Sequence, residues 1–332
     1  MSQQNTEHVG QCVGKHLVWL DCDPGHDDFF AILMCIHPDI KLLGISTVGG
    51  NQTVEKTTLN ALKAITAMGS DFAEVPVVKG QAKPMVRPAK HCAEIHGETG
   101  LDGPTFPKLT KTAITDEKAV NYMYKVISSQ DRPVNLICTG QFTNAALLLI
   151  LYPEIKSKIA QIIVMGGAIG FGNTSPAAEF NIEGDPEAAS VLFESGLKVV
   201  MCPLEVTHTA LATPQILERC DKMNSKFGAI CKELLMFFKD TYKRVFFMED
   251  PPLHDPCTIA YLLNPSLFTL EFMRVDVECS SRFCNGRTVC DVYHMSNQPK
   301  NVHVATKVNV SGFWDLLFEC LHLVDKVTCL NH

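Results

Sequence analysis

The chain has 332 residues, of which 46% are hydrophobic and 20% are charged, a composition that supports a buried core and excludes a largely disordered protein. The formal net charge of −7 and the lack of a basic stripe argue against a nucleic-acid partner. The densest apolar runs, residues 29–36 and 145–152, are far shorter than the roughly 20 residues that span a bilayer, so no membrane association is expected.

Residues 1–15 are polar and lack the apolar stretch of a secretory signal peptide, so a polar N-terminal tail is expected. Residues 16–332 contain no low-complexity linker and no internal repeat, which favours a single domain. The 14 cysteines are scattered, without a CxxC pair or a zinc-type Cys/His spacing. We interpret them as reduced thiols of a cytoplasmic protein.

Short apolar runs alternate with helix-like stretches through the first two thirds of the chain. Strands are predicted at residues 16–20, 41–48, 75–78, 134–138, 161–165 and 197–202. Helices are predicted between them at residues 28–36, 53–68, 116–129, 143–151 and 186–194. This alternation predicts an α/β fold, with an open, mostly parallel, doubly wound (Rossmann-like) sheet and helices on both faces.

The last third of the chain changes character. Two longer helices are predicted at residues 214–220 and 226–247, and a closing helix at 312–324. Extra C-terminal strands are predicted at residues 271–279, 287–294 and 302–308, separated by turn-rich loops. These strands are expected either as antiparallel additions to the sheet edge or as a small appended layer.

Small and polar residues follow several of the predicted strands. Residues 21–28, 49–51 and 139–144 each come directly after an apolar run. In an open parallel sheet, ligands bind at the carboxyl ends of the strands near a switch in strand order. We therefore expect one site at this edge of the sheet.

The most informative segment is residues 21–28, which read Asp-Cys-Asp-Pro-Gly-His-Asp-Asp. Four carboxylates within eight residues repel one another unless a positive charge lies between them. Their position at a strand-to-helix turn suggests a preformed site for a hard divalent cation with oxygen ligands. The alternative is one helix-capping acid with solvated neighbours, but capping needs only one carboxylate.

Two further segments carry candidate site residues. In the proline-flanked segment 251–256, Asp255 is a candidate third acidic ligand and His254 a candidate proton donor. On its own, this pair would more often be a helix cap beside a surface histidine. In residues 172–181, Asn173, Glu179 and Asn181 suit sugar hydroxyls, although an ordinary polar loop has a similar composition.

A fourth segment, residues 96–103, lies in a long stretch, 80–105, for which no regular structure is predicted. Long loops in compact domains are often mobile lids, and the glycines here permit hinge motion. On closure, His96 would reach a ligand. A plain surface loop is the alternative.

Together these segments closely resemble the inosine–uridine-preferring nucleoside hydrolase family. Residues 21–28 are similar to its N-terminal fingerprint, and the resemblance continues through 47–51, 97–103, 143–144, 179–181, 254–256 and 286–291. It covers roughly residues 17 to 318. One departure is the pair Gln141-Phe142, where many members have Pro and Leu, a difference that affects the metal-facing turn without removing a ligand.

The resemblance implies a set of site residues. It implies a Ca²⁺ ion held by Asp23, Asp28, Asp255 and the backbone carbonyl of Thr139. It places Asp27, Asn51, Asn173, Glu179 and Asn181 against the ribose. It places His96 and His254 near the base, with Tyr242 and Arg244 at the border of the base pocket.

The resemblance also implies the reaction, which is hydrolysis of the N-glycosidic bond of a ribonucleoside during nucleoside salvage. Asp23 would be the general base, and His254 would protonate the departing base. The presence of His254 favours the broad or pyrimidine-accepting class. A homodimer or homotetramer is implied as well.

Three other classes of protein were weighed against this interpretation. A haloacid-dehalogenase-type phosphotransferase would explain Asp21 and Asp23, but the other segments lack the basic residue that a phosphate needs. A non-catalytic ribonucleoside-binding protein on the same fold is the alternative to an enzyme. A dinucleotide-binding dehydrogenase is not supported, because no GxGxxG motif follows a predicted strand.

Overall fold

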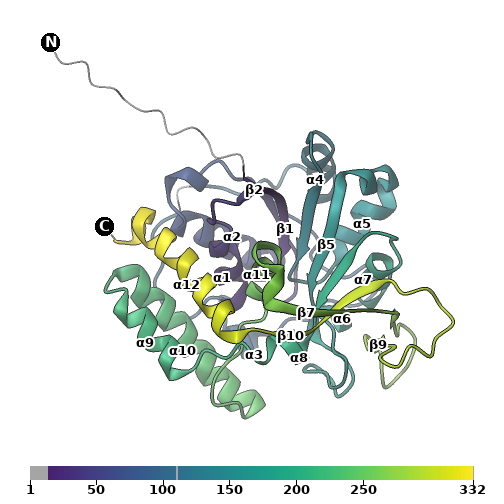
Figure 1. Cartoon of the computed structure of the whole chain (residues 1–332). Coiled ribbons are helices and arrows are strands. Elements are labelled where there is room, and N and C mark those ends of the chain that lie inside the picture. Colours follow the sequence, from purple (N-terminus) through teal and green to yellow (C-terminus); the bar gives the residue numbers. More distant parts are fainter. Residues whose placement is uncertain (1–13, 110, 332) are drawn as a thin grey trace.

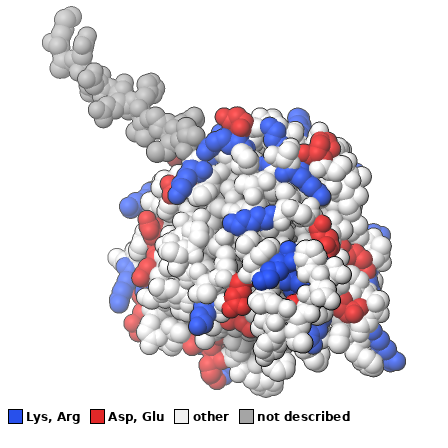
Figure 2. Space-filling model, turned by 45° about the vertical axis from the view of Figure 1, so that its right-hand side comes forward, with Lys and Arg blue, Asp and Glu red and all other residues white. Residues whose placement is uncertain are grey.

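The computed structural model describes residues 14–109 and 111–331 (Figure 1). Most of the predicted polar tail, 1–15, therefore lies outside the described residues. None of the helices in the described ranges combines the length and apolar character that crossing a membrane requires. On the face shown in Figure 2, basic and acidic side chains are interspersed among uncharged ones.

An eight-stranded sheet with the strand order β3-β2-β1-β4-β5-β6-β10-β7 forms the centre of the molecule. Seven strands are parallel: β1 (His16–Cys22), β2 (Ile40–Thr47), β3 (Val77–Lys79), β4 (Val134–Cys138), β5 (Ile159–Met165), β6 (Val199–Cys202) and β10 (Val302–Val308). The edge strand β7 (Phe268–Met273) runs antiparallel to β10. The strand order reverses between β1 and β4, which is where such sheets bind ligands.

Both faces of the sheet are covered, so its central strands consist almost entirely of apolar residues. In β1, Val18 and Leu20 face one core and Leu17 and Trp19 the other, as the two-residue period of a strand requires. The first core packs against α1 (His26–Met34), α2 (Val54–Ala67), α9 (Pro214–Lys222), α10 (Lys226–Phe246), α11 (Pro256–Leu263) and α12 (Val310–Val327). The second packs against α4 (Ala119–Ser128), α5 (Thr143–Leu151) and α7 (Pro186–Phe193), on the opposite side in Figure 1. The predicted α/β fold is confirmed.

Short elements complete the chain. Three helices of four or five residues are α3 (Ala93–His96), α6 (Phe180–Gly184) and α8 (Leu204–Thr207). Short 3₁₀ helices occupy Ser70–Phe72, Pro153–Lys158, Pro265–Leu267 and Cys329–Asn331. The prediction that residues 80–105 lack regular structure was wrong at α3.

The C-terminal strands take both predicted arrangements, except that β10 was expected in neither place and is a parallel strand inside the main sheet. The predicted strand 271–279 is divided: β7 ends at Met273, and β8 (Val275–Val277) pairs with β9 (Thr288–Cys290) in a separate antiparallel sheet. The division has a local cause, because the side chain of Asn301 accepts from the N–H of Val275 and donates to its carbonyl oxygen. These two bonds replace the ladder to β10. The predicted strand 287–294 is shorter than expected, and β10 is parallel to β6 within the main sheet.

Candidate active site

The acidic segment forms the turn between β1 and α1. The N–H of Gly25 donates to Oδ2 of Asp28 at 3.0 Å, which places Asp27 and Asp28 in the first turn of α1. Two glycines let the surrounding chain approach closely. A Cβ at Gly25 would lie 2.3 Å from Nδ1 of His96, and one at Gly50 would lie 2.0 Å from Oδ2 of Asp23. These positions admit no larger residue without a shift of the site.

Three buried carboxyl groups converge at the carboxyl end of β1. Asp27, Asp28 and Asp255 each offer an oxygen, and these atoms all lie within 4.8 Å of one another. Asp255 comes from the N-terminus of α11, more than two hundred residues away in the chain. Thr139, after β4, donates its hydroxyl to Oδ1 of Asp28 at 2.8 Å. The fold thus joins two acidic segments that the sequence keeps far apart.

Burial and mutual repulsion raise the pKa values of the carboxyl groups in this cluster. Burial, followed by repulsion from Asp28, raises the pKa of Asp27 to about 7. Burial and the charge of Asp27 raise the pKa of Asp255 well above its usual range. Such carboxyls cannot all be ionised unless a cation lies among them. None of the described residues that line the adjoining cavity is Lys or Arg.

Unpartnered oxygens provide an independent test of whether a metal fits. Oδ1 of Asp23 and Oδ1 of Asp27 are buried and have no hydrogen-bond partner among the described residues. A buried polar atom without a partner is energetically unfavourable. Oxygen-only donors of this kind suit a hard cation. The acidic cluster therefore fits a metal ion.

Asp23, the predicted general base and ligand, lies beside the cluster rather than within the group of three. Its Oδ2 accepts from the backbone N–H of Asn51 at 2.7 Å. Asn51 also donates its amide to Oδ2 of Asp28 at 3.1 Å, so it links the two acids. Burial raises the pKa of Asp23 well above its usual range, with the charge of Asp28 as the second cause.

Three polar residues from the segment between β5 and α7 form one wall of the cavity. Asn181 donates its amide to the carbonyl oxygen of Thr139 at 2.8 Å. Glu179 caps α6 and accepts from the N–H groups of Asn181, Ile182 and Gly167 at 2.9–3.1 Å. Asn173 accepts from the N–H of Phe180 at 3.0 Å. Main-chain bonds thus fix these side chains before any ligand binds.

The opposite wall comes from α10, α3 and the segment before α11. Nε2 of His254 lies 2.8 Å from the hydroxyl oxygen of Tyr242, which is on α10. His96, at the end of α3, accepts from the N–H of His26 at 3.2 Å. The His26 ring stacks on Phe237 and Phe238. His26, for which no role is predicted from the sequence, therefore supports His96.

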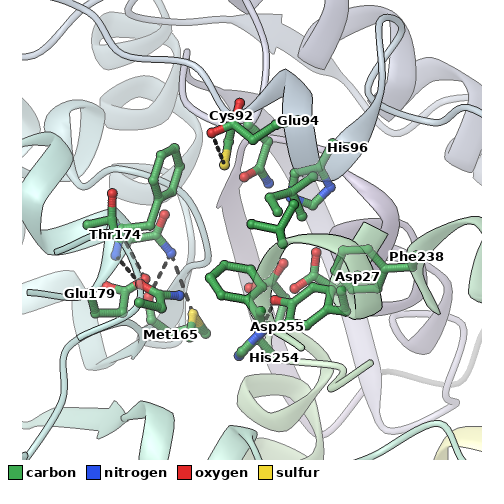
Figure 3. A pocket seen from close by; sticks show the side chains of 18 of the residues that line it. Asp27, Cys92, Glu94, His96, Met165, Thr174, Glu179, Phe238, His254 and Asp255 are labelled. Carbon is green, nitrogen blue, oxygen red and sulfur yellow. Dashed lines mark hydrogen bonds between the residues drawn. The ribbon is translucent and has the colours of Figure 1, made fainter. Parts of the chain in front are cut away.

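These walls enclose a cavity of about 280 Å³ (Figure 3). Ten predicted site residues line it: Asp27, Asn51, His96, Thr139, Asn173, Glu179, Asn181, Tyr242, His254 and Asp255. Asp23 and Asp28 are not among the lining residues, although both are bonded to Asn51. Arg244 does not line the cavity either, because its side chain donates to the carbonyl oxygen of Glu94 and joins α10 to α3.

The sequence did not single out several lining residues: Cys92, Glu94, Ile95, Met165, Thr174, Phe180, Phe238, Val245 and Phe246. A signal was available for α10, where Phe238, Tyr242, Val245 and Phe246 recur at helical spacing on one face. No comparable signal exists for α3, because four residues carry no periodicity.

The fold and the site define an α/β protein with a buried acidic cluster beneath a cavity that is polar on one side and aromatic on the other. The family described as "Inosine-uridine preferring nucleoside hydrolase" matches residues 18–315 of the chain. The chain belongs to this family, and it is an enzyme that hydrolyses N-glycosyl bonds.

Individual relatives agree with this assignment. The chain is 49% identical to a "Probable ribonucleoside hydrolase" of Dictyostelium discoideum, over 95% of each chain. It is 43% identical to the "Pyrimidine-specific ribonucleoside hydrolase RihA" of Escherichia coli O1:K1 / APEC, over 92% of this chain and 97% of that one. The solved structure of a purine-preferring ribonucleoside hydrolase from Gardnerella vaginalis superposes with a TM-score of 0.86 at 30% identity, covering 93% of this chain and 99% of that one.

Proposed function

We propose that this protein hydrolyses the N-glycosidic bond of ribonucleosides to ribose and a free base, with Ca²⁺ in the acidic cluster. The convergence of Asp27, Asp28 and Asp255 within 4.8 Å, directly beside the cavity, carries this proposal. A sugar in the cavity would then lie against the metal.

The donor set favours Ca²⁺. Asp23, Asp28, Asp255 and the Thr139 carbonyl would hold the ion, and each of these donors is an oxygen. When bound, the ion would lower the pKa of a coordinated water. Oδ1 of Asp23 is buried and has no hydrogen-bond partner in the described part of the chain, so it could accept a proton from this water as a general base.

The polar wall suits the ribose. Asp27 and Asn51 lie at the acidic end of the cavity, and Asn173, Glu179 and Asn181 lie across it. None of these groups is cationic, so the wall suits hydroxyls rather than phosphate. It would also stabilise the positive charge that develops on the sugar as the glycosidic bond breaks.

The other wall suits the base. Tyr242 and His254 form a hydrogen-bonded pair that faces the cavity, and His254 would supply the proton that the departing base takes up. We propose a broad or pyrimidine-accepting specificity, supported by this histidine and by the 43% identity to a relative named as pyrimidine-specific.

We also propose a compartment and an oligomeric state for the enzyme. The thirteen cysteines in the described part of the chain are free thiols, which supports a reducing compartment such as the cytoplasm and a role in nucleoside salvage. Assembly into a homodimer or homotetramer is proposed from the family resemblance alone.

The test is release of free ribose from a panel of nucleosides, measured for the wild type and for Asp23→Ala, with and without a Ca²⁺ chelator. We expect release that the chelator abolishes, that added Ca²⁺ restores and that the variant lacks. A 2′-deoxynucleoside should be a poor substrate, because it leaves buried polar groups unpaired. Undiminished release after complete metal removal would overturn the role of the ion.

A further inference from the structure

His254 is held from both sides by hydroxyl groups. Its Nδ1 lies 2.8 Å from Oγ1 of Thr207, and its Nε2 lies 2.8 Å from the hydroxyl oxygen of Tyr242. Thr207 is completely buried, and among the described residues its hydroxyl bonds to His254 alone. Tyr242 lines the cavity and Thr207 does not, so Thr207 lies behind the ring.

The main chain fixes the distance between Thr207 and His254. Thr207 ends α8, and the strand-like segment that follows it pairs with the segment before His254. The N–H of Ala212 donates to the carbonyl oxygen of Pro251 at 2.8 Å, and the N–H of Leu253 donates to that of Ala210 at 3.0 Å. The hydrogen-bonded backbone therefore holds the Thr207 hydroxyl beside Nδ1 of His254.

The contact constrains the orientation of the ring. An imidazole nitrogen and a threonine hydroxyl can pair with either group as the donor, so the bond persists in either tautomer. A rotated ring would turn carbon atoms toward the two hydroxyls and leave buried nitrogens without partners, which is unfavourable. Only with Nδ1 on Thr207 does Nε2 face Tyr242 and the cavity.

We propose that Thr207 is a positioning residue for protonation of the departing base, because its hydroxyl holds the His254 ring with Nε2 directed toward Tyr242. This inference rests on the proposed function, since it needs His254 to serve the leaving group. It assigns a role to a residue that touches neither the sugar nor the base.

The test compares two substrates that differ in their need for a proton. Uracil leaves uridine with the help of an acid, whereas nitrophenolate leaves p-nitrophenyl β-D-ribofuranoside without one. Thr207→Val keeps the shape of the side chain and removes the hydroxyl. We expect kcat for uridine to fall about tenfold or more, and kcat for the nitrophenyl riboside to stay within about twofold. Thr207→Ser, which restores the hydroxyl, should recover uridine hydrolysis.

Two controls separate positioning from a general structural defect. Thr209→Val removes an exposed hydroxyl whose one bond within residues 14–109 and 111–331 is to the carbonyl oxygen of Val206, at 2.7 Å, so it should leave both substrates unaffected. In a His254→Ala background, Thr207→Val should cause no further loss, because the two residues act through one contact.

Several outcomes would overturn the proposal. Thr207→Val could slow hydrolysis of both substrates equally, slow neither, or cause a further loss in the His254→Ala background. Each of these results would contradict the positioning role of Thr207, and none would contradict the proposed hydrolase activity. A wild-type enzyme that releases ribose from neither substrate would instead overturn the proposed function on which the inference rests.

Discussion

The two ends of the cavity are built in different ways. At the acidic end, side chains are held by hydrogen bonds at the ends of strands: Asn51 bridges Asp23 and Asp28, and Asn181 bonds to the carbonyl oxygen of Thr139. At the aromatic end, rings pack along one helix. Phe238 and Phe246 lie 4.7 Å and 4.9 Å from the Tyr242 ring, centroid to centroid.

From this difference we expect attack on the sugar and selection of the base to belong to different ends of the cavity, with His254 at the aromatic end as the proposed proton donor. Hydrogen bonds are directional, so the acidic end fixes the position of each oxygen and suits bond cleavage. Apolar packing is non-directional, so the aromatic end tolerates changes of size and suits discrimination between bases. Similar chains carry the names of pyrimidine-specific and of purine-preferring enzymes, so proteins named for different base preferences share this fold.

Asp255→Asn should give the largest effect, because it removes one carboxylate of the cluster at the acidic end. We expect kcat/KM to fall about a thousandfold for every nucleoside alike, because one of the carboxylates proposed to hold the ion loses its charge. The ratio of uridine to inosine hydrolysis should stay constant. Steady-state kinetics at saturating Ca²⁺ would measure both quantities.

Asp255→Asn should also change the free energy of unfolding. Asp255 is buried against Asp27 and Asp28, and burial and these charges raise the pKa of its carboxyl well above the usual range. Removing one such acid relieves repulsion. In the presence of chelator, Asp255→Asn should therefore have a free energy of unfolding about 1–2 kcal/mol higher than that of the wild type. Urea unfolding would measure it, and a less stable variant would show that the cluster is not under electrostatic strain.

His254→Ala should give the second-largest effect, and it tests whether the aromatic end also takes part in bond cleavage. We expect kcat for uridine to fall about 10²-fold, because the proposed proton donor is lost. The loss should be smaller for 5-fluorouridine, whose more acidic base leaves with less help. Equal losses for the two substrates would assign His254 to binding rather than to leaving-group protonation.

The acidic end was also the more predictable one. Strands β4 and β10 and helix α5 have the predicted bounds. For β4 the reason is burial, because every residue of this strand is buried and only Asn135 is polar. The acids follow apolar runs or precede a helix-starting proline, so local chemistry marks them. Asp27, and not Asp23, forms the group of three carboxylates with Asp28 and Asp255. This depends on the directions of the side chains, which the spacing in the sequence does not encode.

The aromatic end could not be predicted in the same way. The spacing of Phe238, Tyr242 and Phe246 shows that they share one face of α10, but a core and a cavity wall give the same pattern. Only the packing of α10 against α3 shows that this face borders the cavity, and α3 is too short to leave a periodic signal. The division of the strand 271–279 likewise depends on Asn301, which reaches Val275 from 26 residues away.

Phe246→Leu should give the smallest effect, and it tests whether selection resides at the aromatic end. The smaller side chain enlarges the cavity beside Tyr242, so the ratio of inosine to uridine hydrolysis should rise about threefold to tenfold. Hydrolysis of the nitrophenyl riboside and dependence on Ca²⁺ should not change. Phe247→Leu is the matched control, because Phe247 is the next residue in the chain and is 89% exposed. If both variants left the ratio unchanged, discrimination between bases would have to come from α3 or from the polar wall instead, and the division of labour between the two ends would fail.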